Sequence, residues 1–409
     1  MPPTPPAAAL SGIRVLDLSR VLAGPWAAQI LGDLGAEVIK VEQPGRGDDT
    51  RAWGPPFIAA GEGPGQLFTG YYLACNRNKQ AVAIDMSRPE GAGLIRRLAA
   101  ESDVVIENFK VGGLAKYGLD YDSLRQVNPR LVYCSVTGFG QDGPYAPRGG
   151  YDFLIQALGG LMSVTGPDGG EPTKVGVPVV DIFTGLYATI AIQAALRHRD
   201  RTGEGQHIDC ALLDTAITIL ANQGTNYLIG GTVPRPMGNA HPNVVPYRPF
   251  EVADGHVVVA VGNDGQFQAL CRMLGRDDIA ADPRFADNRG RVENRVALES
   301  LLAADLAPRP RAEVLAAMLS FGVPGGPINT VAQAFEDPQV IARGMLERHV
   351  TAAGTELPLT RFPAVLSATP AQIRRLPPGL GADTDAVLGG LAGLDAAALA
   401  ALRDRGVIG

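Results

Sequence analysis

The sequence predicts an α/β fold in which a large domain built on a parallel sheet is followed by a smaller α+β domain. From residue 12 to about 145, short β-branched runs alternate with amphipathic helical segments, a pattern typical of a parallel sheet covered on both faces. Near residue 223 the composition changes, and a hairpin pattern follows a linker rich in Gly and Pro. These observations predict a disordered tail at 1–10, a large domain at 11–222, a small domain at 223–325 and a return to the large domain at 326–409.

The elements of the large domain follow from the spacing of apolar residues. Buried strands are predicted at 13–18, 37–42, 81–85, 104–108, 131–136 and 206–210. Helices are predicted at 24–34, 89–100, 121–127, 184–198 and 211–220. Ligands of such sheets collect at the carboxyl ends of the strands. Chemistry is therefore expected in the loops 19–25, 43–51, 85–88, 108–116 and 137–150.

The rest of the chain predicts the small domain and a terminal helix. Residues 247–262 have the pattern of a hairpin, and helices are expected at 265–275, 311–320 and 396–403. The longest apolar run, 182–196, is shorter than the roughly 20 apolar residues of a membrane span. It favours a buried helix, and no membrane partner is expected.

Composition restricts the class of protein. The 409 residues carry 36 Lys and Arg against 42 Asp and Glu, a net charge of −6, so no basic field is available to attract nucleic acid. Charged residues make up 19%, below the roughly 25% of average usage, which favours large buried surfaces or an oligomer. The four cysteines are far apart, and the N-terminus lacks the pattern of a signal peptide. We expect a cytoplasmic enzyme without disulfides.

Several common motifs are absent or out of context. The first strand is not followed by GxGxxG, and neither GxxxxGK[ST] nor GxSxG occurs, which disfavours dinucleotide redox, nucleotide hydrolysis and hydrolase chemistry. A GxGxxG at 138–143 is followed by Pro144 and is interpreted as a loop. The five histidines lack HxxxH spacing, so no metal site is predicted.

Asp181 is the carboxylate that stands out. It ends the apolar stretch 175–181, directly before the predicted helix. One interpretation is a helix N-cap, a position at which Asp is preferred. The other is a partly desolvated nucleophile that attacks a thioester or anhydride carbonyl, with the N–H groups of the helix start stabilising the developing oxyanion. The two roles are compatible.

The chain resembles the family III CoA-transferases, which include formyl-CoA:oxalate and carnitine CoA-transferases and the α-methylacyl-CoA racemases. The resemblance covers nearly the whole chain and depends on the order and spacing of several short motifs together. They are LSGIRVLDL at 10–18, AGP at 23–25, LGDLGAEVIKVE at 31–42, GDDTR at 47–51, NK at 78–79, IENF at 106–109, GFGQDGP at 138–144 and GEGQ at 203–206. The resemblance implies a Rossmann-like large domain and an interlocked homodimer, in which each chain threads through a ring made by the other.

By this resemblance Asp181 is the catalytic aspartate. Its carboxylate is expected to attack the donor acyl-CoA, giving a mixed anhydride and then an aspartyl-CoA thioester, from which the acceptor acid takes CoA through a second anhydride. Each intermediate is hydrolysable, so the site must exclude water. Coenzyme A enters as a substrate, and no tightly bound cofactor is implied.

The resemblance also implies the CoA-binding residues. They are Leu22, Ala23, Gln43, Ile84, Asp85, Met86, Ser87, Asn108, Phe109, Lys110, Lys116, Val136, Thr137, Gly138 and Phe139. Lys116 and Gln43 stand where the family usually has Arg. Lysine still offers a point charge to a phosphate, and either Arg46 or Arg51 is expected to replace the charge missing at Gln43.

Two features select a branch of the family. The racemases carry a His as proton-transfer base after the GQxGP segment, whereas this chain has Tyr151, which disfavours racemisation. The segment 238–247 resembles the carnitine-type and succinyl-CoA-dependent dicarboxylate transferases. Its neighbourhood supplies His241, Asn243 and Arg235 as candidate contacts of the acceptor acid, although a structural turn explains these residues equally well.

The prediction is a CoA-transferase that moves CoA from an acyl-CoA, expected to be succinyl-CoA, to a carboxylic acid, expected to be a dicarboxylate such as glutarate. The alternatives are an α-methylacyl-CoA racemase or epimerase and a non-catalytic acyl-CoA-binding protein.

Overall fold

The computed structural model describes residues 8–59, 67–351 and 353–409. Contacts within the chain define two compact units. The first contains residues 1–161, 175–225 and 341–409, and the second contains 162–174 and 226–340. The second unit thus begins at Asn226, takes in a short earlier segment and extends to Val340. The domain boundaries at 223 and 325 stay a prediction.

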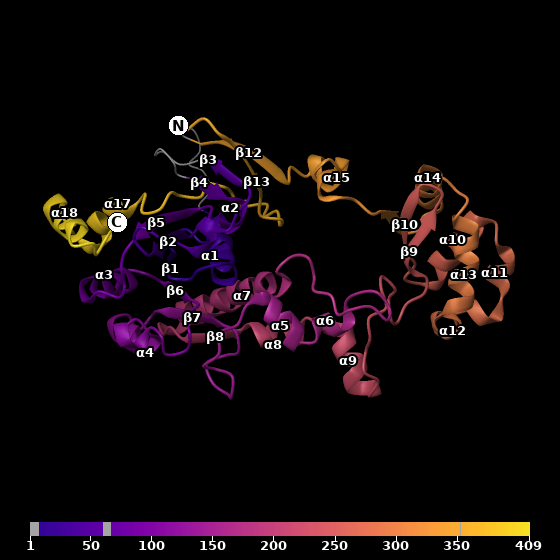
Figure 1. The fold of residues 1–409 in the computed structure, drawn as a ribbon, viewed down its shortest axis with the longest axis horizontal. Coiled ribbons are helices and arrows are strands. Elements are labelled where there is room, and N and C mark those ends of the chain that lie inside the picture. Colours follow the sequence, from indigo (N-terminus) through magenta and orange to yellow (C-terminus); the bar gives the residue numbers. More distant parts are fainter. Residues whose placement is uncertain (1–7, 60–66, 352) are drawn as a thin grey trace. The chain divides into compact units, whose positions relative to one another are not determined.

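The first unit is built on a six-stranded sheet of the predicted kind. Its strands are β1 (Arg14–Asp17), β2 (Glu37–Glu42), β5 (Lys79–Ala83), β6 (Val104–Glu107), β7 (Val132–Thr137) and β8 (His207–Ala211). Their order is β5-β2-β1-β6-β7-β8, and every neighbouring pair is parallel. Figure 1 shows them stacked in this order. The strand order reverses between β1 and β6, which makes their carboxyl ends the expected place for a ligand.

Helices cover both faces of the sheet because side chains of successive strand residues point to opposite faces. Leu16 and Ile39 pack against α3 (Pro89–Ala100), α4 (Tyr121–Val127), α17 (Thr384–Ala392) and α18 (Ala396–Asp404). Val15 and Val38 pack on the other face against α1 (Ala23–Asp33), α5 (Asp152–Leu158), α7 (Val179–Thr202) and α8 (Leu212–Thr218). Strands and helices between 13 and 136 lie within a few residues of the predicted ranges.

The C-terminal segment returns to the first unit and extends its sheet edge. Ile408 forms a bridge with Ile84, and the N–H of Asp85 donates to the carbonyl of Val407. Two small antiparallel ribbons were not predicted. They are β3 (Phe57–Ala59) with β4 (Leu67–Thr69), and β12 (Leu346–Val350) with β13 (Glu356–Thr360). The first unit also contains α2 (Gly70–Cys75), α9 (Ala221–Gly230, shared with the second unit), α16 (Pro338–Ala342, likewise shared), and the short 3-10 helices η1 (Asp49–Ala52) and η2 (Ala115–Tyr117).

Helix α7 differs from the prediction in both bounds. It begins at Val179 rather than 184 and ends at Thr202 rather than 198. Within the described ranges it is the one helix long and apolar enough to cross a membrane by length and composition, and 44% of its apolar window is buried. A single such helix is weak evidence for spanning, because core helices of globular proteins share these properties. One side of α7 packs on the sheet, and the other exposes Phe183, Leu186, Tyr187 and Ile190.

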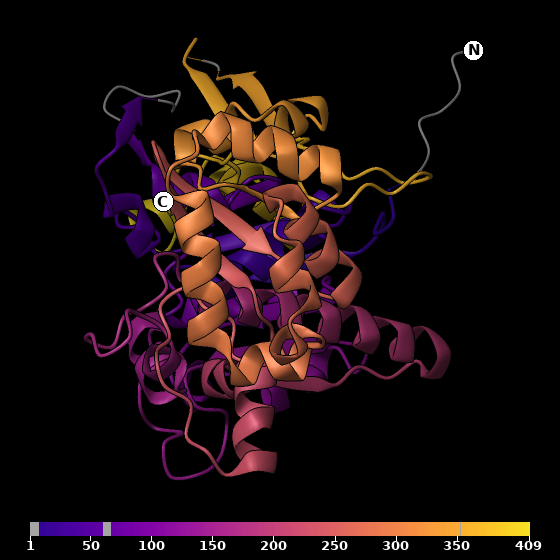
Figure 2. The same ribbon diagram turned by 90° about the vertical axis from the view of Figure 1, so that its right-hand side faces the viewer.

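The second unit contains the predicted hairpin. Strands β9 (Tyr247–Val252) and β10 (Gly255–Ala260) are antiparallel, and β11 (Gly325–Pro327) pairs with β10. Its apolar core includes Phe250, Val257 and Phe267. Its helices are α6 (Leu161–Val164, whose first residue belongs to the first unit), α10 (Asp264–Leu274), α11 (Asp277–Ala281), η3 (Pro283–Phe285), α12 (Asn288–Glu293), α13 (Arg295–Leu306), α14 (Arg311–Phe321) and α15 (Val331–Phe335). Figure 2 faces this unit, with orange helices in front of the salmon strands.

Candidate active site

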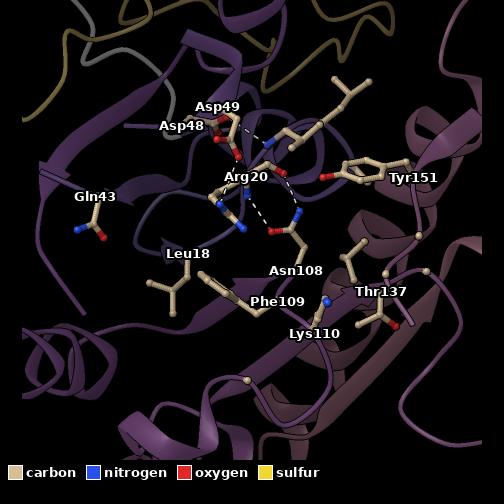
Figure 3. Close-up of a pocket in the computed structure, with 18 of the residues that line it drawn as sticks. Leu18, Arg20, Gln43, Asp48, Asp49, Asn108, Phe109, Lys110, Thr137 and Tyr151 are labelled. Carbon is tan, nitrogen blue, oxygen red and sulfur yellow. Dashed lines mark hydrogen bonds and ion pairs between the residues drawn. The ribbon is translucent and has the colours of Figure 1, made fainter. Parts of the chain in front are cut away.

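A cavity of about 1100 Å³ lies in the first unit at the carboxyl ends of β1, β2, β6 and β7. Its wall comes from the loops that follow these strands, as the parallel sheet predicts. Figure 3 shows Leu18 and Arg20 from the loop after β1, Asn108, Phe109 and Lys110 from the loop after β6, and Tyr151 on the opposite side.

The loops after β1 and β6 are joined at the point where the strand order reverses. The N–H of Arg20 donates to Asn108 Oδ1 over 2.9 Å, and Asn108 Nδ2 donates to the Arg20 carbonyl over 2.6 Å. The Arg20 guanidinium lies over the Phe109 ring, 5.3 Å from its centroid. These contacts fix the wall of the cavity without using Lys110, which also lines it.

Two buried ion pairs support the part of the wall formed by the loop after β1. Lys40 Nζ lies 2.9 Å from Asp48 Oδ2, and Lys79 Nζ lies 2.9 Å from Asp17 Oδ2, with all four side chains buried. Asp48 also accepts from the N–H of Val21 at 3.3 Å. Val21 has a φ of 71°, a left-handed conformation that is strained for a β-branched residue, and such strain persists only where the surroundings hold it.

Asp181 lies in the first turn of α7 and lines the cavity. It is only 8% exposed. In the part of the chain that the structure describes, no side chain donates a hydrogen bond to its carboxylate. Burial raises the pKa of Asp181, and the negative charge of Asp152 raises it further, to about 7. A cavity-facing carboxyl group with this pKa is a candidate for covalent or acid–base chemistry.

The interpretation of Asp181 as the helix N-cap is wrong. The N-cap of α7 is Pro178, and the carboxylate that caps the helix belongs to Asp152 at the start of α5. Asp152 Oδ1 accepts from the N–H of Val180 at 2.8 Å and from that of Asp181 at 3.2 Å. The sequence pattern missed this because the cap comes from a residue 29 positions away.

The prediction that the N–H groups of the helix start stabilise an oxyanion is also wrong. The N–H groups of Val180 and Asp181 donate to Asp152, that of Val179 donates to the Val177 carbonyl, and that of Ile182 donates to the Pro178 carbonyl. All four amides are occupied within the protein.

A close approach of two glycines precedes Tyr151, which lines the cavity, and Asp152, which begins α5. A Cβ atom on Gly138 would lie 2.7 Å from the Gly150 Cα, and one on Gly150 would lie 2.6 Å from the Gly138 Cα. No side chain fits there, so the loop that begins after β7 folds back on itself. Residues 138–143 form part of this loop and open no helix, as predicted.

Most of the predicted CoA-binding residues are brought together around this cavity. Those that line it are Leu22, Ala23, Gln43, Met86, Ser87, Asn108, Phe109, Lys110, Lys116, Val136, Thr137 and Gly138. Their contact with CoA stays a prediction. Sequence reasoning missed Arg20, Arg148 and Tyr117, which also line the cavity. Arg20 and Arg148 lie in the expected loops 19–25 and 137–150, whereas Tyr117 lies one residue beyond the expected loop 108–116.

Ile84, Asp85 and Phe139 are not among the residues that line the cavity. Ile84 is fully buried in the core and pairs with Ile408, so its side chain is not available to a ligand. Asp85 Oδ1 accepts from the N–H and hydroxyl of Ser87, which orders the loop after β5. Phe139 packs against Tyr145, with ring centroids 5.5 Å apart.

Arg46 and Arg51, the two predicted replacements for the charge missing at Gln43, have different surroundings. Arg51 donates to both Glu42 oxygens over 2.7 Å and to the Tyr72 hydroxyl over 2.6 Å, and its side chain is 12% exposed. Arg46 lines the cavity with a side chain that is 75% exposed, held by Asp49 at 2.6 Å. Of the two arginines only Arg46 is among the described residues that line the cavity, and its binding of a phosphate stays a prediction.

The predicted acceptor contacts lie in the second unit and make local contacts there. His241 Nδ1 accepts from the N–H of Asn243 at 3.1 Å, and the side chain of Asn243 accepts from Asn226 at 2.9 Å. Arg235 pairs with Asp168 at 3.1 Å on the surface. These contacts are those of a structural turn, and a role in acceptor binding stays a prediction. Among the described residues, no group of three or more His, Cys, Asp or Glu is placed to hold a metal ion.

Comparison with known proteins identifies the relatives of the chain. The family model described as CoA-transferase family III matches residues 10–384. A protein of Agrobacterium fabrum named succinate–glutarate CoA-transferase is 53% identical over 91% of this chain and 93% of its own length. A mouse protein named succinyl-CoA:glutarate CoA-transferase is 41% identical over 98% of this chain and 90% of its own. The crystal structure of a CAIB/BAIF family protein from Brucella suis is 52% identical and superposes with a TM-score of 0.83, covering 94% of this chain and 100% of that one.

Proposed function

The chain belongs to CoA-transferase family III, and from this premise we propose that it transfers CoA from succinyl-CoA to a dicarboxylic acid such as glutarate, with Asp181 as the covalent nucleophile. The predicted family is confirmed, and the chain is a CoA-transferase. The names of relatives that are 53% and 41% identical support this choice of donor and acceptor.

The observation that carries the proposed role of Asp181 is its unengaged carboxylate. Asp152 caps the helix, so the side chain of Asp181 is not needed for local structure. No donor stabilises its charge within the described residues, and burial together with the charge of Asp152 raises its pKa to about 7. A desolvated carboxylate without hydrogen bonds is a stronger nucleophile than one in water, because attack removes a charge that its surroundings do not stabilise.

The proposed reaction has two symmetrical halves. The ionised Asp181 oxygen attacks the thioester carbonyl of succinyl-CoA, the C–S bond breaks, and CoA leaves as a thiolate. The thiolate attacks the Asp181 carbonyl of the anhydride, which releases succinate and leaves an aspartyl-CoA thioester. The acceptor carboxylate then displaces the thiolate from Asp181, and the thiolate attacks the acceptor carbonyl of the second anhydride, which restores the Asp181 carboxylate.

The cavity wall suits a ligand with an anionic end and an apolar arm. Leu22, Ala23 and Val136 provide apolar surface, while Arg46, Lys116 and Arg148 supply positive charge for phosphates. A CoA whose thiol end reaches Asp181 would cover the nucleophile and limit access of water to the hydrolysable intermediates.

The proposal includes a cytoplasmic, interlocked homodimer that does not bind a membrane or nucleic acid. An apolar face of α7 that exposes Phe183, Tyr187 and Ile190 supports a partner surface of the same chain. The four cysteines are free and buried, which suits a reducing compartment.

Trapping the acyl-enzyme tests the role of Asp181. Protein incubated with succinyl-CoA is treated with hydroxylamine, and the modified peptide is mapped by mass spectrometry. We expect modification at Asp181, and loss of transfer from succinyl-CoA to glutarate by at least about 10³-fold in Asp181→Ala with CoA binding retained. Modification at another residue would contradict the assignment.

Two further measurements separate this proposal from its alternatives. Incubation of an acyl-CoA in deuterated buffer without an acceptor acid is expected to leave the α-carbon unlabelled, whereas a racemase would incorporate deuterium. A non-catalytic binding protein would bind CoA, yet wild type and Asp181→Ala would both fail to transfer it to any of a panel of acids.

A further inference from the structure

We propose that Asp152 is a positioning residue for Asp181, which holds the backbone of the nucleophile through two amides and promotes its acylation by like-charge repulsion. This inference rests on the proposed function. It adds a role for a residue that does not itself form a bond with the substrate.

The geometry fixes Asp152 at both of its oxygens. Oδ1 accepts from the N–H groups of Val180 and Asp181 at 2.8 and 3.2 Å, and Oδ2 accepts from Gln156 Nε2 at 2.6 Å. Gln156 is fully buried, and its Oε1 accepts from the N–H of Val175 at 2.9 Å. Asp152 and Gln156 lie one turn apart on α5, so they hold the first turn of α7 and the segment before it against a second helix.

This arrangement differs from ordinary helix capping. An N-cap acid normally belongs to the chain segment that enters its own helix. Here the acid comes from another element, so the two hydrogen bonds fix Asp181 relative to α5 as well as within α7. A shift of the nucleophile by about 1 Å is enough to lower a rate substantially, which gives the second helix a direct role in its placement.

The charge of Asp152 acts in a second way. Placing two carboxylates together raises the energy of the state in which both are ionised. Once Asp181 becomes an anhydride or thioester, its charge is gone and the repulsion ends. The repulsion therefore favours formation of both covalent intermediates, and it also contributes to the raised pKa of Asp181.

Other groups near Asp181 do not cancel this repulsion. Tyr71 of α2 is close enough that the charge of Asp181 contributes to raising the pKa of the phenol, and a neutral phenol brings no positive charge. Of the cations that line the cavity, Arg20 is paired with Asp49 at 3.2 Å, and Arg148 lies over the Tyr145 ring. Lys110 also lines the cavity. None of these cations contributes to the pKa shift of Asp181. The charged group that contributes to it is Asp152.

Three variants separate the roles of hydrogen bonding and charge. Asp152→Asn keeps an oxygen for the two amides and removes the charge, and Asp152→Ala removes both. Asp152→Asn also loses the hydrogen bond that Gln156 Nε2 donates to Asp152 Oδ2. Gln156→Met removes this same hydrogen bond but keeps the charge of Asp152, so it is the matched control. Each protein is mixed with succinyl-CoA in a single turnover between pH 5 and 9, quenched, and assayed for acylated Asp181 by mass spectrometry.

For wild type, the acylation rate is expected to rise with pH around a midpoint near 7. Asp152→Asn is expected to lower this midpoint by about one pH unit and, at pH 9, to reduce the ratio of acylated to free Asp181 about tenfold, since one pKa unit corresponds to a factor of ten in an equilibrium constant. Gln156→Met is expected to leave the midpoint unchanged. Asp152→Ala is expected to slow acylation at least about tenfold further than Asp152→Asn at every pH, because both amides lose their acceptor.

An unchanged midpoint and acylated fraction in Asp152→Asn would overturn the role of charge, and equal rates for the Asn and Ala variants would overturn the positioning role. Both outcomes require acylation of Asp181 in wild type. Acylation at another residue, or none, would instead contradict the proposed function and so is distinguishable from failure of this inference.

Discussion

Asp48 and Asp181 are buried carboxylates that line the same cavity, yet their surroundings give them opposite properties. Burial opposes ionisation of Asp48, but the Lys40 ammonium and hydrogen bonds from Thr50 lower its pKa to about 2. Burial likewise opposes ionisation of Asp181, and its charged neighbour is a second carboxylate, so its pKa rises to about 7. Asp48 is ionised at neutral pH, whereas Asp181 is divided between two states.

The comparison shows that partners, more than burial, decide what a carboxylate near this cavity does. The paired group holds the loop after β1, including the strained backbone of Val21. Asp181, the unpaired group, keeps its carboxylate oxygens available to a substrate, and its buried charge lowers the stability of the folded state. Asp17 follows the first pattern, because Lys79, Lys40 and Ser19 together lower its pKa despite burial.

The largest expected effect on stability comes from removing the cation that pairs with Asp48. Lys40→Met leaves Asp48 buried without its cation, and loss of one partner of a buried ion pair typically costs about 3 to 5 kcal/mol of unfolding free energy. Urea denaturation of the variant and wild type measures this loss. The exposed, cavity-lining Lys116→Met is the matched control and is expected to change stability by less than about 0.5 kcal/mol. Equal stability of the two variants would show that the ion pair does not support the fold.

The next effect concerns Asp181, where a substitution is expected to raise the stability of the protein. The pKa of Asp181 is raised above its ordinary value of 3.8, so the folded state holds a proton that the unfolded state releases between about pH 4 and 7. Stability therefore falls as pH rises through this window, and the full penalty applies above pH 7. Asp181→Asn removes the charge and is expected to stabilise the protein by up to about 4 kcal/mol at pH 8, with little difference near pH 4.

Thermal or urea unfolding of Asp181→Asn at the two pH values measures this gain. Asp142→Asn, at an exposed position in the loop after β7, is the control and is expected to change stability at neither pH. A gain of the same size at pH 4 and pH 8 would mean that it arises from packing and not from removal of a buried charge.

The sheet could be predicted from sequence because its signal is local. The run Val104 to Ile106 is apolar on both faces, and the neighbouring helices repeat with the helical period, so these strands and helices were placed within a few residues. The start of α7 was placed five residues late because Val179 and Val180 continue an apolar run that resembles a strand. Short ribbons such as β12 and β13 were missed because a pair of five-residue strands carries little periodic signal.

The site was predictable to the extent that it consists of loops at strand ends. Most of the predicted site residues, Asp181 among them, line the cavity, but the pairing of its buried charged side chains was not predicted. Lys40 and Lys79 each form a buried ion pair, with Asp48 and Asp17 respectively. These pairings depend on which strands are neighbours, and no local sequence pattern determines that. The cap of α7 by Asp152 and the burial of Ile84 against Ile408 join residues far apart in sequence in the same way.

The smallest expected effect applies the comparison to two arginines. Arg51 is paired with Glu42 and buried, whereas the exposed Arg46 is held only by Asp49. Arg46→Gln is expected to raise the Kd for CoA about five- to tenfold, equivalent to about 1 to 1.4 kcal/mol, with stability almost unchanged because exposed ion pairs contribute little. Isothermal titration measures this, with succinylpantetheine as the control ligand, since it has no phosphate and its affinity should be unaffected. Equal weakening of both ligands would exclude phosphate recognition by Arg46, and Arg51→Gln is expected instead to lower the stability of the fold.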